Sequence, residues 1–151
     1  RISNLDNFVE VEPNNDRTKA TPGTAPGAFN GVISEPKDFD FFKFTAKKDQ
    51  QFEVEVYARR IRSGLDPVAY IYDAATGKQL FSNDDSRGPD SYFRFKAPAD
   101  GEFVVAVRDH LWNGDPTYTY RIEMTPIEPN LEATPIEFAR YVQQLIQIPS
   151  I

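Results

Sequence analysis

The segment Gln51-Phe52-Glu53-Val54-Glu55-Val56-Tyr57-Ala58 decides the fold class of this chain. Apolar side chains recur at every second position from Phe52 to Ala58, and the glutamates occupy positions between them. Successive side chains of a β-strand point to opposite faces, so this period of two predicts a strand that is buried on one face only.

The same period continues along the chain. Tyr118–Met124 and Ser91–Lys96 also alternate, whereas Gly101–Arg108 is apolar at nearly every position and is expected to be a central strand covered on both faces. The remaining predicted strands are Asp38–Thr45, Val68–Asp73, Phe29–Ser34 and Gln79–Phe81. Turn-forming residues separate them, and short strands about ten residues apart predict an all-β protein, an antiparallel β-sandwich or jelly roll of about eight strands.

The length of 151 residues suits one main domain. We expect an N-terminal flank over residues 1–8, the sandwich over residues 9–126, and a linker or the start of a following module over residues 127–151, where three prolines punctuate the chain. The net charge of −6 argues against nucleic acid and anionic membranes as partners, because both require a cationic face. No apolar stretch approaches the roughly twenty residues of a membrane helix. The absence of cysteine excludes disulfides and a cysteine nucleophile.

An acidic segment precedes the predicted sandwich. It reads Glu10-Val11-Glu12-Pro13-Asn14-Asn15-Asp16, and Asp38 and Asp40 follow about twenty residues later. Carboxylates and amide oxygens are the ligands that calcium takes, about six to eight at a time. A solvated turn is the alternative interpretation, since proline, asparagine and aspartate are common turn formers.

Several phrases, taken in order, resemble the bacterial pre-peptidase C-terminal domain family. They are Val11-Glu12-Pro13-Asn14-Asn15-Asp16, Gly31-Val32-Ile33, Asp38-Phe39-Asp40-Phe41-Phe42-Lys43-Phe44, Leu65-Asp66-Pro67, Ile71-Tyr72-Asp73, Ser82-Asn83-Asp84-Asp85, Asp90-Ser91, Ala97-Pro98-Ala99-Asp100-Gly101 and Tyr118-Thr119-Tyr120-Arg121-Ile122. The resemblance covers about residues 9–126. It implies a jelly-roll sandwich attached to secreted bacterial enzymes and multidomain surface proteins, without catalytic activity of its own.

The family is similar to the collagen-binding domains of clostridial collagenases, and this similarity implies a calcium site. The residues that match its ligands are Glu10, Glu12, Asn14, Asn15 and Asp40, with Asp38 as a further candidate. The chain departs from that pattern at Pro13, where a polar residue is expected, and at Asn15, where an aspartate would add charge. The implied role of calcium is structural: it would tie the acidic segment to the sandwich.

Other groups of polar residues carry weaker signals. Asn83, Asp84, Asp85 and Asp90 form a second candidate metal site, although their spacing does not match an EF-hand and a solvated hairpin loop is the favoured explanation. The only histidine, His110, would have to serve any serine-type triad, and no Gly-x-Ser-x-Gly motif accompanies it.

Aromatic residues offer a candidate ligand site. Trp112 and Tyr118 could stack on a sugar ring or pack against an extended peptide, or Trp112 could instead fill the edge of the sandwich.

The leading hypothesis is therefore a noncatalytic accessory module of a secreted bacterial protein, monomeric and stabilised by calcium. It would contact neighbouring domains of its own polypeptide and bind an extended extracellular protein or a polysaccharide through the aromatic and arginine residues of one sheet face. A structural spacer without a ligand is the alternative, and a hydrolase is the remote one. A contiguous exposed aromatic patch would indicate binding, whereas polar outer faces would indicate a spacer.

Overall fold

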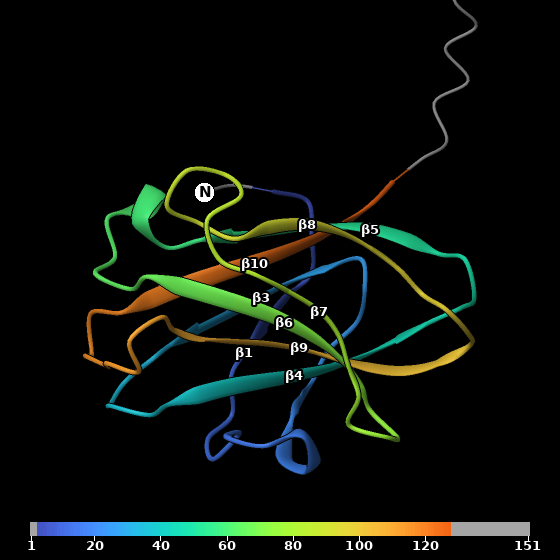
Figure 1. Ribbon diagram of the computed structural model, residues 1–151, viewed down its shortest axis with the longest axis horizontal. Coiled ribbons are helices and arrows are strands. Elements are labelled where there is room, and N and C mark those ends of the chain that lie inside the picture. The colour runs from blue at the N-terminus through green and yellow to red at the C-terminus, as the bar shows by residue number, and fades with distance from the viewer. Residues whose placement is uncertain (1–2, 128–151) are drawn as a thin grey trace, which may run out of the picture.

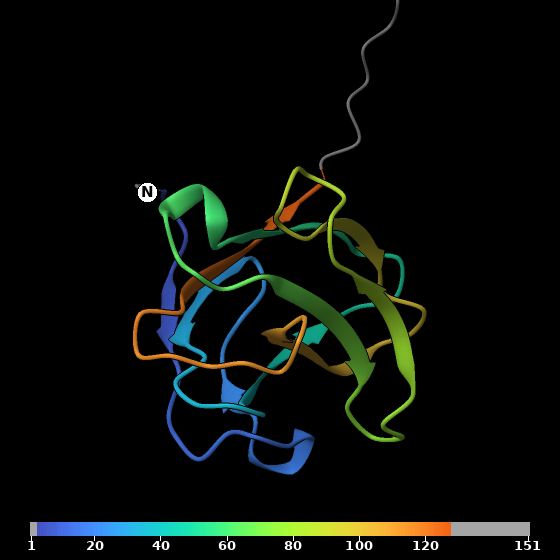
Figure 2. The ribbon, with the colours of Figure 1, turned by 60° about the vertical axis from the view of Figure 1, so that its left-hand side comes forward.

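The computed structural model describes residues 3–127, and the predicted linker or module beyond residue 127 lies outside the described residues. Two five-stranded sheets face each other in this part of the chain, as Figures 1 and 2 show. The strands are β1 (Asn7–Val9), β2 (Thr21–Pro22), β3 (Gly27–Val32), β4 (Phe39–Ala46), β5 (Gln51–Tyr57), β6 (Pro67–Asp73), β7 (Gln79–Asn83), β8 (Tyr92–Lys96), β9 (Gly101–Asp109) and β10 (Thr119–Pro126). Two 3-10 turns complete the set, η1 (Arg17–Lys19) and η2 (Arg59–Ile61).

The strand order is β1-β3-β10-β5-β8 in one sheet, called sheet A here, and β2-β4-β9-β6-β7 in the other, sheet B. Adjacent strands are antiparallel except β1 with β3 and β2 with β4, which are parallel. The predicted sandwich is confirmed, with two corrections: the described residues form ten strands instead of about eight, and the sheets are mixed. Both corrections come from β1 and β2, which span only three and two residues and so are too short to display a period of two.

The core lies between the sheets and confirms the alternation in β5. Phe52, Val54 and Val56 are at most 2% exposed and pack in the main cluster, while Glu53 and Glu55 face outward. The largest fully buried rings are Phe29, Phe42, Phe44, Phe52 and Phe103. Burying aromatic and aliphatic side chains of this size contributes about 1.5–3 kcal/mol each, which makes this cluster the main source of stability.

Strand β9 is central in sheet B, as its apolar sequence predicts. Phe103, Val105 and Val107 point into the main core, whereas Val104 and Ala106 lie on the outer face in a second, smaller cluster. This outer cluster also contains Phe41 and is covered by half-buried rings, so the outer face of sheet B is apolar.

The acidic segment lies where the two sheets come together at one side of the sandwich. β1 forms the outermost strand of sheet A and β2 the outermost strand of sheet B, so residues 10–20 cross from one sheet to the other. β1 starts at Asn7, two residues before the expected start of the sandwich, and the Phe8 ring stacks on Phe29 with centroids 5.6 Å apart. Within residues 3–127, no helix is long and apolar enough to cross a membrane.

Candidate metal centre

Three carboxylates converge where the acidic segment crosses between the sheets. Glu10, Glu12 and Asp40 each place a carboxylate oxygen within 4.8 Å of the others. Glu10 directly follows β1, Glu12 lies in the segment itself, and Asp40 belongs to β4. Three negative groups this close repel one another unless protons or a cation lie between them.

Backbone and hydroxyl donors hold the Glu10 side chain in place. One carboxylate oxygen accepts a hydrogen bond from the Val32 N–H at 3.0 Å, and the other lies 3.2 Å from the Tyr120 hydroxyl oxygen. Gly31 makes this approach possible, because a Cβ at that position would collide with both the Glu10 carboxylate and the Tyr120 hydroxyl. The sheet is therefore built to admit a carboxylate at this point.

Asp40 is the buried member of the cluster, with no exposed surface. Its Oδ2 accepts a hydrogen bond of 2.6 Å from the Tyr120 hydroxyl. Burial and the hydrogen bond shared with Glu10 raise the pKa of Asp40 to about 10, and burial also raises the pKa of Glu10. Without a cation, Asp40 therefore keeps a proton at neutral pH, and a bound cation would take the place of that proton.

Asn14 adds an amide to the three carboxylates. It is fully buried, and one terminal atom of its amide lies 3.1 Å from Asp40 Oδ1 and 3.3 Å from Glu12 Oε2. An NH2 group there would donate hydrogen bonds to both carboxylates, whereas an amide oxygen there would share a cation with them. The Asn14 N–H also donates to Glu12 Oε2 at 2.9 Å, which fixes the turn.

This donor set fits calcium. All four side chains offer hard oxygen ligands, and no nitrogen or sulfur ligand is among them. Calcium takes about six to eight oxygens, so backbone carbonyls or water would complete its coordination. Glu10, Glu12, Asn14 and Asp40 are the residues that would hold it.

The other two predicted ligands point elsewhere. Asn15 uses its side-chain oxygen to accept a hydrogen bond from the Phe39 N–H at 3.0 Å. Asp38 Oδ2 accepts from the Ser34 N–H and hydroxyl, while its Oδ1 is buried and has no hydrogen-bond partner among residues 3–127. Asp38 acts on the site through its charge, which contributes to the raised pKa of Asp40.

Tyr120 is the site residue that sequence reasoning missed. The alternation of apolar and polar residues around Tyr120 predicts that its side chain lies in the core, and the structure confirms this, with 3% of the residue exposed. Nothing in the sequence marks its hydroxyl as the group that contacts both Glu10 and Asp40 across the two sheets. Burial raises its pKa well above the usual value for tyrosine, so the hydroxyl remains a donor.

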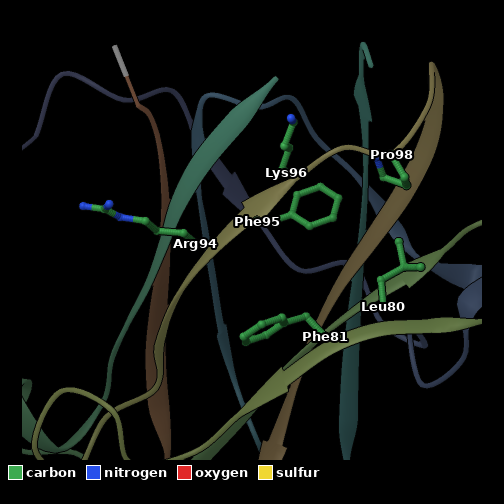
Figure 3. A pocket seen from close by; sticks show the side chains of 6 residues that line it. All are labelled: Leu80, Phe81, Arg94, Phe95, Lys96 and Pro98. Atoms are coloured by element: carbon green, nitrogen blue, oxygen red, sulfur yellow. The ribbon is translucent and has the colours of Figure 1, made fainter. Parts of the chain in front are cut away.

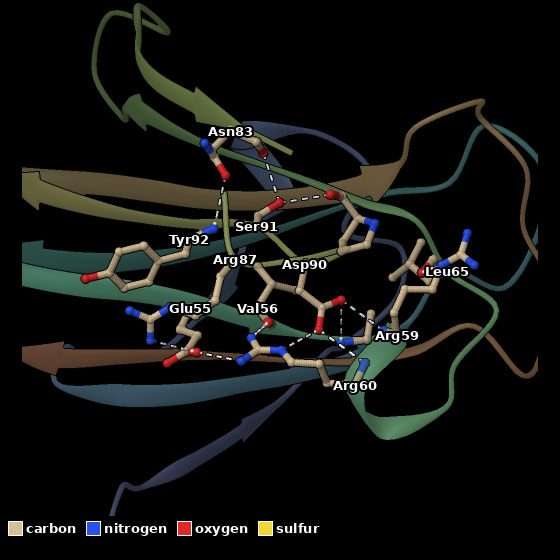
Figure 4. Close-up of polar contacts among 12 residues, drawn as sticks. Glu55, Val56, Arg59, Arg60, Leu65, Asn83, Arg87, Asp90, Ser91 and Tyr92 are labelled. Atoms are coloured by element: carbon tan, nitrogen blue, oxygen red, sulfur yellow. Dashed lines mark hydrogen bonds and ion pairs between the residues drawn. The ribbon is translucent and has the colours of Figure 1, made fainter. Parts of the chain in front are cut away.

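The second acidic loop does not assemble a metal site. Asp90 is fully buried and accepts hydrogen bonds from the backbone N–H groups of Ala58, Arg59 and Arg60 at the start of η2, and from the Arg60 guanidinium at 2.8 Å (Figure 4). Asn83 bonds to the Tyr92 N–H, and Asp84 pairs with His110 at 3.4 Å. Within residues 3–127, the only acidic cluster that gathers three ligand atoms is that of Glu10, Glu12 and Asp40.

His110 contacts a carboxylate, that of Asp84. Within the described residues, its side chain forms no hydrogen bond with a serine or threonine hydroxyl, and its partner Asp84 is half-exposed. Asp109, its neighbour in sequence, instead accepts hydrogen bonds from the N–H groups of Asp66, Leu111 and Asn113 and so shapes the loop after β9.

An aromatic strip covers the outer face of sheet B. We define it by Phe39, Phe41, Tyr70, Tyr72 and Trp112. Neighbouring ring centroids lie 4.3–6.1 Å apart, and the Arg108 guanidinium lies 4.2 Å from the Trp112 ring centroid. Trp112 is 43% exposed, at one end of the strip.

Tyr118 does not belong to this strip. It packs against the main core and over Gly64, and no ring contact joins it to Trp112 in the described residues. The predicted pair of aromatic ligand residues is therefore separated, and Trp112 instead contacts Phe39 of β4 and Arg108 of β9.

Sheet A presents the opposite chemistry on its outer face. Glu53 pairs with Arg94 at 3.1 Å, Glu55 with Arg60 at 2.7 Å and with Arg87 at 3.2 Å. Arg121 pairs with Glu123 at 2.8 Å. One outer face of the sandwich is thus aromatic and the other is covered by ion pairs.

Comparison with known proteins agrees with the fold. A region of 77 residues is 42% identical to part of a probable subtilase-type serine protease of Deinococcus radiodurans. This region makes up 50% of this chain but only 10% of that protein. The solved pre-peptidase C-terminal domain of collagenase from Bacillus anthracis superposes with a TM-score of 0.55 at 13% identity, covering 70% of this chain and 94% of that one. PliG of Aeromonas hydrophila, a periplasmic inhibitor of g-type lysozyme, has the same fold with a TM-score of 0.53 at 13% identity, covering 70% of this chain and 97% of that one.

The family model of the bacterial pre-peptidase C-terminal domain matches residues 38–109, from the strand that carries Asp40 to the end of β9. This match includes several of the phrases on which the resemblance was based. Residues 38–109 of this chain belong to the bacterial pre-peptidase C-terminal domain family.

Proposed function

We propose that this chain is a noncatalytic accessory module of a secreted bacterial protein, that calcium stabilises it, and that it binds an extended protein or a polysaccharide through the aromatic strip. The observation that carries the proposal is the asymmetry between the two outer faces. A spacer needs only polar faces, and a strip of half-buried rings ending in an exposed tryptophan is a feature of a binding surface.

The strip suits an elongated ligand. Tyr70 and Tyr72 are two residues apart on β6, and their rings are nearly parallel, with an interplanar angle of 20°. Phe39 and Phe41 repeat this spacing on β4. The rings form two rows, along β4 and β6, on either side of β9. Phe41 is buried, so the half-exposed rings of Phe39, Tyr70 and Tyr72 offer the stacking surfaces to a chain that runs across the strands, and each tyrosine adds a polar hydroxyl.

Calcium would act as a clamp for the acidic segment. This segment already bonds to the edge of β4, because the Asn14 C=O accepts from the Phe41 N–H at 3.2 Å and Asn15 accepts from the Phe39 N–H. A cation shared by Glu10, Glu12, Asn14 and Asp40 would neutralise the carboxylates and join both sheets to the segment.

The family supports an accessory role. The chain spans about a tenth of the Deinococcus protease, so most of that protein lies outside the matched region. We infer that neighbouring domains of the same polypeptide are partners of this module, and that the module works outside the cytoplasm as a monomer.

The ligand is tested by sedimentation with insoluble polymers: chitin and cellulose for polysaccharides, and gelatin for an extended protein. The double variant Tyr70→Ala with Tyr72→Ala should lower the bound fraction, since each lost aromatic contact costs roughly 0.5–1.5 kcal/mol beyond the buried area. Tyr92→Ala, on the outer face of sheet A, is the matched control and should bind as the wild type does. Failure of the wild type to bind any of the three polymers would favour the spacer.

Calcium is tested separately, by titration calorimetry on the metal-free chain. About one bound ion is expected for the wild type, and none for Asp40→Asn with Glu12→Gln. An absence of heat would reduce the acidic segment to a hydrogen-bonded turn.

A further inference from the structure

A groove lies between the free edges of the two sheets, on the side of the sandwich away from the acidic segment. β7 is the last strand of sheet B and β8 the last strand of sheet A. Between them lies a groove of about 240 Å³, lined by Leu80, Phe81, Arg94, Phe95, Lys96 and Pro98 (Figure 3). Phe81 is 39% exposed and stacks on Phe93 at 4.5 Å.

The backbone of β8 has unpaired groups on its groove side. The Val56 N–H donates to the Ser91 C=O and the Ala97 N–H donates to the Gln50 C=O, so the odd-numbered residues of β8 bond to β5. The N–H and C=O groups of Arg94 and Lys96 therefore face away from β5. The Tyr92 N–H points the same way, since it donates to the Asn83 side chain at 3.1 Å. The described residues place no such partner beside the backbone of Arg94 or Lys96.

An extended strand fits this edge better than a small molecule does. The groove is smaller than the roughly 300–1,000 Å³ of small-molecule sites, but it has room for a few side chains. A strand that pairs with β8 gains main-chain hydrogen bonds at Arg94 and Lys96. Side chains directly opposite those two residues lie on the outer face of sheet A, and the side chains between them enter the groove.

The residues at the edge of the groove and those that line its base indicate which side chains a bound strand would carry. Arg94 and Lys96 are exposed cations, each with one carboxylate partner, Glu53 at 3.1 Å and Asp49 at 2.9 Å. A carboxylate on the incoming strand would give each cation a second partner across the strand pair. The floor of Leu80, Phe81, Phe95 and Pro98 requires apolar side chains at the positions between.

A second copy of this chain fits poorly. Antiparallel pairing of two β8 edges about a two-fold axis would place Arg94 opposite Arg94 or opposite Lys96, and like charges directly opposite are destabilising. We propose that the free edge of β8 binds an extended strand of another protein in which acidic and apolar residues alternate. This site is separate from the aromatic strip and does not depend on the proposed ligand there.

The test is fluorescence anisotropy with the full 151-residue chain and a labelled heptapeptide of alternating glutamate and valine. The acidic peptide should bind saturably, and about tenfold more tightly than the same peptide with lysine in place of glutamate. Arg94→Glu combined with Lys96→Glu should reverse this preference. Lys43→Glu, an exposed lysine of sheet B, is the control that should leave it unchanged.

Two further measurements locate the peptide. Amide exchange of Arg94 and Lys96 should slow on binding, while that of Phe93 and Phe95 stays the same because these amides already bond to β5. Arg94→Pro removes an N–H that faces the free edge, so the variant should melt as the wild type does but lose the peptide. The proposal is overturned by equal affinity for the two peptides, by self-association through β8, or by protection elsewhere in the absence of protection at Arg94 and Lys96. If Arg94→Pro unfolds, the peptide preference of the variant with Arg94→Glu and Lys96→Glu and the amide exchange of the wild type still test the proposal.

Discussion

Replacing Asp40 by asparagine should have opposite effects on stability in chelator and in calcium. The side chain of Asp40 is fully buried, and its carboxyl pKa is raised to about 10 by burial and by its hydrogen bond with Glu10. Asparagine has nearly the same shape and no charge. Its oxygen can accept the hydrogen bond from Tyr120, and its NH2 group can donate to the Asn14 amide oxygen.

The magnitude follows from the linkage between protonation and folding. The pKa of Asp40 in the folded protein lies above its usual value of 3.8, so between these values the folded state binds more protons than the unfolded state. The contribution of Asp40 to the stability of the metal-free protein is therefore fully present below about pH 4 and is lost as the pH rises toward about 10. The cost at neutral pH has an upper bound of about 4 kcal/mol, at 1.36 kcal/mol per pH unit. Because Glu10 and Asp40 share one proton, the actual cost is smaller than this bound. We therefore expect Asp40→Asn to raise the free energy of unfolding in chelator by about 2 kcal/mol.

Calcium should reverse this difference, so that the wild type becomes more stable than Asp40→Asn. A ligand at about 1,000 times its dissociation constant stabilises the folded state by about 4 kcal/mol, and the variant lacks the buried charged ligand that provides most of this gain. The assay is urea unfolding followed by circular dichroism, in chelator and in calcium, at about pH 5 and about pH 8. The reasoning fails if the variant is less stable than the wild type in chelator, or if the difference in stability between variant and wild type in chelator is the same at both pH values.

The remaining predictions concern other residues of the site and the core. Glu12→Ala should lower the melting temperature more in calcium than in chelator, because Glu12 is exposed and without calcium the variant loses only the hydrogen bond from the Asn14 N–H; equal loss in both conditions would contradict its role as a ligand. Gly31→Ala should abolish calcium binding in calorimetry, since the added Cβ collides with Glu10 and Tyr120, and retention of wild-type affinity would show that Glu10 is not a ligand. Phe42→Ala should cost about 3–5 kcal/mol in either condition, because the ring is fully buried against Phe29, and a loss below about 1 kcal/mol in urea unfolding would refute this. Asp90→Ala should cost about 3–5 kcal/mol by leaving Arg60 and three backbone N–H groups without their acceptor, whereas a variant as stable as the wild type would mean that water replaces the carboxylate.

Much of the fold could be predicted because its elements are long enough to show a period. β5, β8, β9 and β10 were predicted to within two residues at each end, since five to nine residues suffice to display alternation or continuous apolarity. β1 and β2 could not be predicted, because strands of three and two residues depend on pairing with distant segments instead of on their own pattern.

The candidate site shows the same division. The acidic segment supplied the candidate ligands Glu10, Glu12 and Asn14, and the position of Asp40 before an aromatic pair supplied the fourth candidate. Asn15 and Asp38 have equally suitable side chains, but local hydrogen bonds to Phe39 and Ser34 direct them away. Proximity in sequence could not distinguish ligands from residues that satisfy the backbone beside them.

The sequence by itself determined the class of fold, the resemblance to the family and the acidic segment, because each depends on residue type and local spacing. Only the tertiary structure decided that Tyr120 joins Glu10 to Asp40, that Trp112 contacts β4 and β9 instead of Tyr118, and that the groove beside β8 is open. Each of these depends on contacts between residues that lie far apart along the chain, and side-chain direction at such contacts is set by the pairing of strands across the two sheets.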